Sequence, residues 1–344
     1  MQTLTIGGRT IGPGHPVFVI AEIGYNFTTL EEGCRSIDAA VQCGVDAVKF
    51  QTFTAETVTS RGVDFPQEAG QTSQFEEFKR FEISEAAHRA LFDHARRRGA
   101  LVFSTPSYFD DVDLLERLEV PAYKVGSDDL TNLPFIDYVA RRGKPLILST
   151  GMSTMAEVVE AVETVYASGN RQLGILHCVS NYPVKDPALL NLRAIHTLQQ
   201  AFGIPVGLSD HTMTLTAALG AVALGATVIE RHFALDKRLE VPDAFFSADP
   251  AEMRALVQGI RELEQMLGSG VKEPVASEAA MRRDTRKSAV ARTDIAAGEL
   301  ITAEHVIVKR PGTGIAPKEL SQVLGRRAKR AIRRDECISW ECLE

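Results

Sequence analysis

The chain has 344 residues, of which 44% are hydrophobic and 24% are charged, and its formal net charge is −7. These values exclude a disordered or fibrous protein, and the length predicts one large domain with an appendage, or two domains. No apolar run approaches the ~18 residues of a membrane span, and residues 1–15 lack the basic and apolar regions of a signal peptide. We therefore expect a cytoplasmic protein whose five cysteines are reduced thiols.

A hairpin and then eight strands are predicted from the N-terminus onward. A Gly-Gly dipeptide at residues 7–8 is a two-residue turn signal between Leu4–Ile6 and Arg9–Ile11. The eight short apolar runs that follow are continuous rather than alternating, which is typical of parallel strands buried on both faces. They cover residues 17–21, 47–50, 101–103, 122–125, 145–148, 173–176, 205–208 and 228–229.

Amphipathic helices are predicted between these strands. Two of them begin with a capping signal, Thr154 with Glu157 and Asp249 with Glu252. Eight strand–helix units in succession favour a closed (β/α)₈ TIM barrel of the α/β class over an open sheet. No Gly-x-Gly-x-x-Gly motif follows the first strand, which argues against a dinucleotide-binding fold. The hairpin would cover the N-terminal end of the barrel.

The C-terminal part is predicted to be a separate small domain with a basic character. We place the barrel at residues 1–270, a linker at 271–284 and a β-rich domain at 285–344, with strands at 288–291 and 305–309. Residues 282–344 carry 14 basic and 9 acidic side chains, whereas the rest of the chain carries 24 and 36. Aromatic residues do not interleave with the basic ones as nucleic-acid binding would require. An acidic protein surface, such as the body of another subunit, fits this tail at least as well.

Polar side chains at the predicted strand ends indicate an anion site. The active site of a (β/α)₈ barrel lies at the carboxyl ends of its strands. Cations and neutral hydrogen-bond donors that converge there from several strands can orient and neutralise a phosphate or another small dianion. Any one of them could be structural, but buried lysines are otherwise rare. The set comprises Lys49, Lys124, Ser127, Ser149, Asn181 and Ser209.

Two histidines that end adjacent strands indicate a metal site. His211 and His232 follow the seventh and eighth strands, so their imidazoles could share one divalent ion with positions left open for water and substrate. A single histidine would instead be structural or a general base, and we expect His177 to be structural. Two protein ligands make a weak site that suits Mn²⁺ first, with Mg²⁺ or Co²⁺ as alternatives, in a Lewis-acid role.

Motifs along nearly the whole chain resemble the sialic acid synthase family, the phosphoenolpyruvate-dependent nonulosonate synthases. The C-terminal Lys309-Arg310-Pro311-Gly312-Thr313-Gly314 resembles the antifreeze-like (SAF) domain of that family, which implies a β-clip-like fold for the small domain. The motifs in the barrel are Ala21-Glu22-Ile23-Gly24-x-Asn26, Val48-Lys49-x-Gln51, Ser104-Thr105-Pro106, Tyr123-Lys124-Val125-Gly126-Ser127, Leu148-Ser149-Thr150-Gly151-Met152, Leu176-His177-Cys178, Tyr182-Pro183, Gly207-Leu208-Ser209-Asp210-His211, Glu230-Arg231-His232-Phe233 and Pro242-Asp243.

The resemblance implies condensation of phosphoenolpyruvate with an N-acetylated hexosamine aldehyde, either N-acetylmannosamine or a 2,4-diacetamido-dideoxyhexose. The products would be a nine-carbon nonulosonic acid and phosphate, released by C–O cleavage. Glu22 and Asp129 would be catalytic. Tyr182, Asp243 and Glu22 would contact the sugar, together with Arg310 from the partner in a domain-swapped homodimer. Phosphoenolpyruvate would be bound by Lys49, Gln51, Lys124, Ser127, Ser149, Asn181 and Ser209.

Departures from the family pattern lie on the sugar side and leave the acceptor open. The usual Asn-His-x-Gly is Asn26-Phe27-Thr28-Thr29, Gln71 and Phe75 stand near positions of Asn and Tyr, and the usual Gly-Glu is Asp128-Asp129. Three alternatives therefore remain. They are a 9-phosphate synthase acting on a 6-phosphorylated acceptor, a metal-dependent pyruvate aldolase, and a non-catalytic carbohydrate-binding relic.

Overall fold

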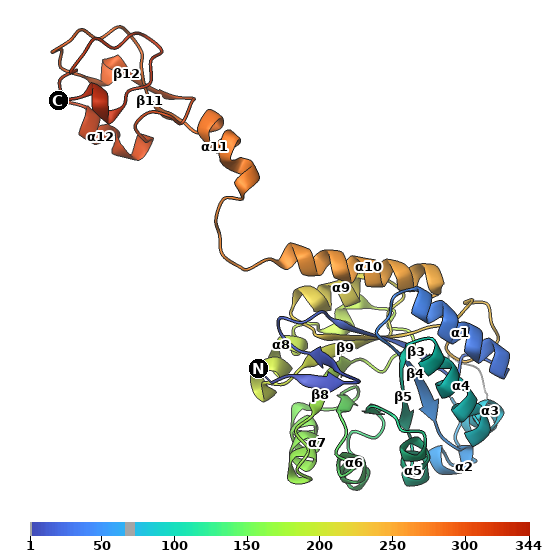
Figure 1. Ribbon diagram of the computed structural model, residues 1–344. Helices are drawn as coiled ribbons and strands as arrows, with labels where there is room; N and C mark the ends of the chain where they lie inside the picture. Colours follow the sequence, from blue (N-terminus) through green and yellow to red (C-terminus); the bar gives the residue numbers. More distant parts are fainter. Residues whose placement is uncertain (1, 66–72) are drawn as a thin grey trace. The chain divides into compact units, whose positions relative to one another are not determined.

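The chain forms two units, Met1–Gly268 and Ser269–Glu344, in a computed structural model that describes residues 2–65 and 73–344 (Figure 1). In the first unit eight parallel strands close into a barrel, and β10 completes the ring by pairing with β3. The predicted TIM barrel is thereby confirmed. Its strands are β3 (Phe18–Gly24), β4 (Ala47–Thr52), β5 (Leu101–Pro106), β6 (Tyr123–Val125), β7 (Leu146–Ser149), β8 (Leu173–Cys178), β9 (Val206–Asp210) and β10 (Val228–His232).

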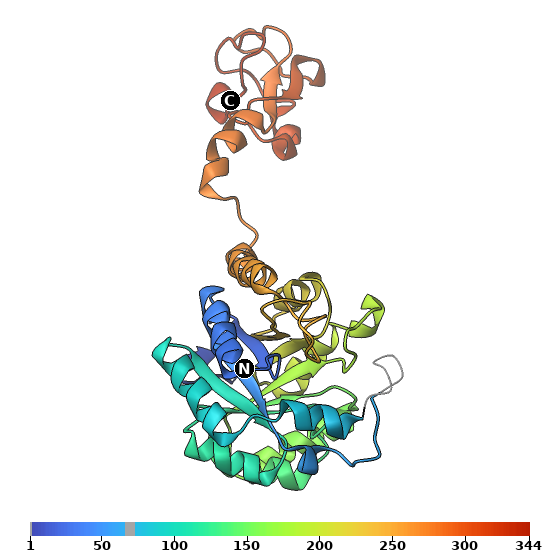
Figure 2. The ribbon, with the colours of Figure 1, turned by 90° about the vertical axis from the view of Figure 1, so that its right-hand side faces the viewer.

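A ring of helices surrounds the barrel, because each strand is followed by a helix that packs on its outer face. Helix α10 contacts both α9 and α1 and so completes the ring (Figures 1 and 2). The capping boxes predicted for α7 and α10 are both present. The helices are α1 (Leu30–Gln42), α4 (Glu85–Arg97), α5 (Phe109–Arg117), α6 (Leu133–Ala140), α7 (Met155–Ala167), α8 (Ala194–Phe202), α9 (Thr216–Ala223) and α10 (Pro250–Leu267).

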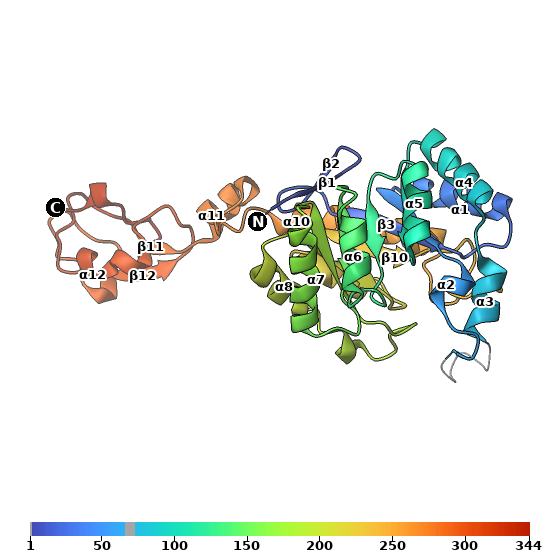
Figure 3. The same ribbon diagram turned by 90° about the horizontal axis from the view of Figure 1, so that it is seen from below.

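The two ends of the barrel are covered differently. The hairpin of β1 (Leu4–Ile6) and β2 (Arg9–Ile11) lies at the amino end of the strands, where the amide of Gln2 donates to the carbonyl of Gly203 just before β9. Three short helices belong to loops that follow strand carboxyl ends, namely α2 (Ala55–Val58), α3 (Gln74–Phe81) and the 3₁₀ helix η2 (Pro187–Leu190). Figure 3 shows the hairpin and the α2–α3 region at opposite ends.

All barrel strands except β6 extend further toward their carboxyl ends than their apolar runs predict. Strand β10, for example, continues to His232, whereas its apolar run ends at residue 229. The apolar run stops where side chains that face the barrel interior become polar, but the backbone hydrogen bonds between strands continue. Glu22, Lys49 and His232 therefore lie within strands, where the ladder fixes their backbone.

The second unit has its own small core. Strand β11 (Ser288–Ala291) pairs antiparallel with β12 (Val306–Lys309), close to the predicted strands. Buried aliphatic side chains pack around this pair, among them Ile301, Val323 and Ile338. The segment predicted to be a linker contains η3 (Ala276–Glu278) and α11 (Ala279–Thr285), and the unit also holds η4 (Ala303–His305), η5 (Pro317–Glu319), α12 (Leu320–Val323) and η6 (Trp340–Cys342).

Across residues 2–65 and 73–344, no helix combines the length and the apolar character needed to cross a membrane.

Gly207 gives a test of how closely β9 and β10 are packed. A Cβ atom at this position would lie 2.2 Å from the carbonyl oxygen of Val228. Because this oxygen belongs to the backbone, the clash cannot be relieved by a side-chain rotation. We expect Gly207→Ala to lower the free energy of unfolding by about 1–3 kcal/mol, as overpacking does. Urea denaturation measures this change. The control is Gly62→Ala, whose Cβ would meet nothing within 4 Å, and equal stability of the two variants would contradict the prediction.

Candidate active site

Two carboxylates and a lysine form an ion-pair cluster inside the barrel. Lys49 Nζ lies 2.7 Å from Glu22 Oε2 and 3.7 Å from Glu230 Oε2, and it donates to Thr105 Oγ1 at 2.9 Å. Gln51 Nε2 donates to Glu22 Oε1 at 3.0 Å. Glu22, Lys49 and Glu230 are each at most 5% exposed. Burial acts to lower the pKa of Lys49, but Glu22 and Glu230 more than offset it and hold that pKa above its usual value.

A second buried lysine lies in the same electrostatic environment. Lys124 is 2% exposed, and its Nζ donates to the carbonyl of Val125 at 2.8 Å. Burial lowers its pKa, Glu230 opposes this, and the positive charge of Lys49 adds to the lowering. Glu230 also accepts a hydrogen bond of 3.0 Å from Ser209 Oγ. Although burial opposes it, the two lysines hold the pKa of Glu230 well below its usual value.

Ser149 leaves a buried hydroxyl without a partner beside this cluster. It ends β7, and its alternation with Ile147, the register partner of Lys124, places it on the same face as that lysine. Ser149 is 3% exposed, and its Oγ makes no hydrogen bond. Buried polar atoms are nearly always paired, so this hydroxyl is suited to a ligand.

The rings of His211 and His232 lie next to each other and pack against aromatic side chains. Their ring centroids are 5.3 Å apart, and the ring of Tyr182 lies 4.3 Å from that of His211. Phe246 packs against His232 at 5.0 Å. Asp243 Oδ2 lies 3.3 Å from His232 Nδ1, without the alignment of a hydrogen bond. The structure thus brings together the predicted metal ligands and two of the predicted sugar contacts.

The imidazole nitrogens of this pair fit a divalent metal. His211 Nδ1 lies 3.0 Å from the carbonyl of Val179, and because a carbonyl only accepts, Nδ1 carries the proton and Nε2 keeps a lone pair. His232 Nδ1 is a buried nitrogen without a hydrogen bond. Among the described residues no three His, Cys, Asp or Glu side chains converge as a metal cluster. A metal held here would rely on the two histidines, with water and substrate completing its coordination.

Four predicted site residues are not joined to these clusters by direct contacts in the structure. Asp129 Oδ1 accepts from Asn132 within its own turn, Ser127 Oγ accepts from the Gly151 amide, and Asn181 is exposed in the loop after β8. Arg310 follows β12 in the second unit, and its predicted contact with the sugar stays a prediction.

The carboxyl group of Asp129 nevertheless has an unusual environment. Burial raises its pKa to about 6, the hydrogen bond from Asn132 opposes the rise, and the charge of Asp128 adds to it. Burial raises the pKa of Tyr182, and the charges of Cys178, Asp243 and Asp128 add to the rise. The acidic pair after β6 therefore has one member whose pKa is raised to about 6 and one whose charge reaches Tyr182.

The residues that depart from the family pattern have structural partners here. Thr29 caps α1 by accepting from the Glu32 amide, and Thr28 donates to the Glu32 carboxylate. Phe27 packs on the barrel core, and Phe75 is buried beneath the guanidinium of Arg61. Gln71 lies outside the described residues.

Sequence reasoning gave no role to two residues that organise the site. Glu230 appeared only as part of a motif, although two buried lysines require more than one counter-charge, and that requirement could have indicated it. Asn26 is buried, donates to Ser247 Oγ and accepts from the amide of Asp243. It therefore ties the end of β3 to the loop that carries Asp243.

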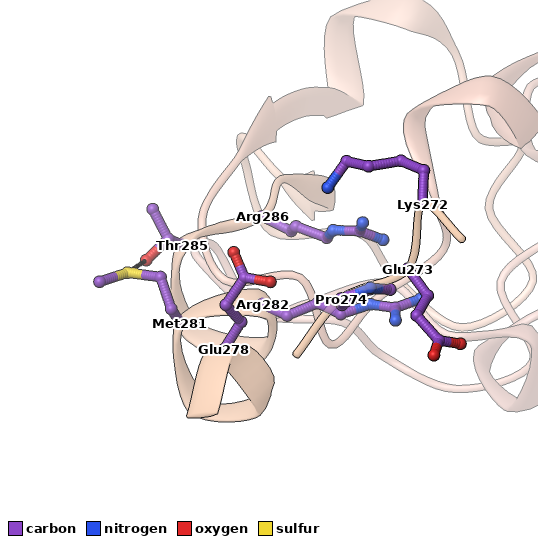
Figure 4. Close-up of a pocket in the computed structure, with 8 residues that line it drawn as sticks. All are labelled: Lys272, Glu273, Pro274, Glu278, Met281, Arg282, Thr285 and Arg286. Atoms are coloured by element: carbon purple, nitrogen blue, oxygen red, sulfur yellow. Dashed lines mark hydrogen bonds between the residues drawn. The ribbon is translucent and has the colours of Figure 1, made fainter. Parts of the chain in front are cut away.

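A separate groove in the second unit contains none of the predicted site residues. Figure 4 shows that side chains of both charges line it, next to helix α11. Its mixed charge offers no dominant attraction for an anion or a cation. The lining residues are Lys272, Glu273, Pro274, Glu278, Met281, Arg282, Thr285 and Arg286.

Comparison with known proteins extends over both units. Residues 36–272 match the NeuB family and residues 286–344 match the SAF domain. The chain is 42% identical over its whole length to an uncharacterised protein of Methanocaldococcus jannaschii, of which it covers 99%. It is 39% identical to the N,N'-diacetyllegionaminic acid synthase of Legionella pneumophila, with 98% of each chain covered.

A solved structure gives the same result. The N-acetylneuraminic acid (sialic acid) synthetase of Leptospira borgpetersenii, crystallised with citrate, superposes with a TM-score of 0.75 at 32% identity, covering 81% of this chain and 95% of that one. The match of the family model to more than half of the chain, and the full-length similarity to a synthase, agree with the barrel fold. The chain belongs to the NeuB family of synthases and carries a C-terminal SAF domain.

Proposed function

We propose that this protein condenses phosphoenolpyruvate with an N-acetylated hexosamine aldehyde to give a nonulosonic acid and phosphate. The observation that carries the proposal is the pair of buried lysines, Lys49 and Lys124, beside the unpaired hydroxyl of Ser149. Two buried cations with a spare donor suit a dianion such as a phosphate ester. A pyruvate aldolase, whose substrate has a single negative charge, has no need of such a site.

Phosphoenolpyruvate, the aldehyde and one water molecule supply all the atoms of the proposed products. C3 of phosphoenolpyruvate attacks the aldehyde carbon, which forms the C–C bond, and the aldehyde oxygen becomes a hydroxyl. Water then adds to the cationic C2, and the C–O bond to phosphate breaks to leave a 2-keto acid. Lys49, Lys124 and Ser149 hold the departing phosphate. Glu22 and Asp129 stabilise the cation at C2 by their negative charge.

His211 and His232 would hold a divalent metal, Mn²⁺ first among the candidates, which when bound polarises the aldehyde oxygen. The residues around them would bind the rest of the acceptor. Tyr182 offers a ring face for the sugar, and Asp243 offers a carboxylate for its hydroxyl groups. Arg310 would reach the sugar from the partner subunit of a homodimer.

The acceptor proposed first is a 2,4-diacetamido-dideoxyhexose. The Legionella relative, similar along 98% of both chains, is named for a product with two N-acetyl groups. N-acetylmannosamine and its 6-phosphate are the competing acceptors. Phosphate release from phosphoenolpyruvate, measured with each of these three aldehydes and Mn²⁺, identifies the acceptor. Absence of phosphate release with all three, from a protein that binds phosphoenolpyruvate, would overturn the proposed reaction.

Lys49→Met tests the phosphate site. The change removes a buried cation and leaves Glu22 and Glu230 with less positive charge near them, so we expect kcat/KM for phosphoenolpyruvate to fall by roughly 10²–10³-fold. Steady-state phosphate release measures the loss. The control Lys79→Met removes an exposed lysine paired with Glu82 and should leave the rate unchanged. Unchanged phosphate release by Lys49→Met, in protein shown to be folded by circular dichroism, would contradict the role of Lys49 in the phosphate site.

The raised pKa of Asp129 predicts how the rate depends on pH. Its pKa of about 6 means that the carboxylate is charged above pH 6 and protonated below it. If the charge stabilises the cation at C2, kcat/KM falls about tenfold for each pH unit below 6. Asp129→Asn should remove this acidic limb and leave a rate lowered by about 10²-fold.

Asp111 provides a matched control for the pH profile. Burial also raises its pKa to about 6, but it lies in the first turn of α5 and accepts from the Ser107 amide. The acidic limb should persist in Asp111→Asn. If it persists in Asp129→Asn as well, the limb does not report the carboxylate of Asp129.

A further inference from the structure

Two consecutive cross-strand pairs join β9 to β10 just before the histidines. Glu230 is the register partner of Ser209, and Arg231 is the register partner of Asp210. His211 directly follows β9, and His232 is the last residue of β10. Side chains alternate along a strand, so the Ser209–Glu230 pair and the two histidines face the barrel interior. The pair between them, Asp210 with Arg231, faces the surrounding helices.

The Asp210–Arg231 pair is fully buried and holds the loop that follows β9. Both residues are 1% exposed, and Arg231 Nη1 lies 2.5 Å from Asp210 Oδ2. The guanidinium also donates to the carbonyl of Thr214 at 2.8 Å and to the carbonyl of Thr212 at 2.7 Å. Asp210 Oδ1 accepts from the Thr212 amide at 2.9 Å. One side chain from β10 thereby binds the side chain of Asp210, just before His211, and the backbone that follows His211.

The imidazoles make few hydrogen bonds of their own. His211 Nδ1 contacts the Val179 carbonyl and the Cys178 sulfur, whereas His232 Nδ1 makes no hydrogen bond. Their separation therefore depends on ring packing with Tyr182 and Phe246 and on the backbone of residues 210–214 and 231–232. Neither Asp210 nor Arg231 faces the substrate side of the barrel, so the pair has no direct part in binding phosphate or sugar.

We propose that Asp210 and Arg231 are positioning residues that set the separation of His211 and His232 and thereby the affinity for the metal. The inference rests on the proposed function, because it assumes that the histidines hold a metal. A buried ion pair adds little stability relative to apolar packing of the same volume. However, the hydrogen bonds that Arg231 donates and Asp210 accepts fix the loop in a way that apolar side chains cannot.

Asp210→Asn is the first test. It keeps the size of the side chain and one acceptor oxygen but removes the charge that aligns the guanidinium. We expect the Kd for Mn²⁺, measured by calorimetry on the full-length protein, to rise about 10–100-fold, as it does when partners of metal ligands are lost. The visible absorption of bound Co²⁺ should change as well, because it reports ligand geometry. The Kd for phosphoenolpyruvate measured without metal should stay as in the unmodified protein.

Asp46→Asn is a matched control at the opposite end of the strands. Asp46 Oδ2 lies 3.0 Å from Arg261 Nη2 and accepts from the Val19 amide, directly before β4. This variant also loses a carboxylate–arginine pair, but far along the chain from either histidine, and its Mn²⁺ affinity should not change. Arg231→Lys is a second variant in case Asp210→Asn folds poorly. It keeps the charge but not the forked donors, and it should also weaken Mn²⁺ binding.

The double variant His211→Ala/His232→Ala separates the two ways in which the inference can fail. Loss of Mn²⁺ binding in this variant, together with unchanged binding in Asp210→Asn and Arg231→Lys, would overturn the positioning role alone. Unchanged Mn²⁺ binding in the double variant would show that the metal lies elsewhere, which would overturn the proposed metal site and the inference with it. Weaker binding in Asp46→Asn equal to that in Asp210→Asn would mean that general destabilisation is responsible.

Discussion

The need to neutralise buried charge inside the barrel is the constraint on which the site depends. Lys49 and Lys124 are both at most 3% exposed, and a buried cation without a counter-charge is costly. Glu22 and Glu230 provide that counter-charge, so the interior is close to neutral without a ligand. In the proposed reaction a phosphate ester would compete with these carboxylates for the two ammonium groups. The paired charges allow the barrel to fold without a ligand.

The architecture was predictable because it depends on periodicity. Eight continuous apolar runs separated by amphipathic helices specify the closed barrel, and the observed ring of strands agrees. The strand ends were not predictable in the same way. Residues such as Lys49 and His232 are polar and yet lie within strands, since the barrel interior near its carboxyl end is lined by the site rather than by a core. Apolar runs mark the core and stop where the site begins.

The site was predictable only as far as strand order determines it. Lys49, Lys124 and His232 are fixed by ladder hydrogen bonds, His211 directly follows β9, and the structure places all four at the barrel interior. Loop residues follow turn geometry, which has no period in the sequence. Asp129 is the example, because its carboxylate accepts from Asn132 within the turn after β6.

The contrast between strand residues and loop residues also bears on the proposed acceptor side of the site. The two threonines that replace family residues after β3 are engaged in capping α1, so their hydroxyl groups are already satisfied within the chain. Asn26, just before them, is instead tied to the amide of Asp243 across more than 200 residues of sequence. The carboxylate of Asp243 in turn lies beside His232. A change in the first loop therefore reaches Asp243 and His232, where we propose that the sugar binds, through Asn26. Lys49 lies within β4, and its position depends on the strand ladder instead.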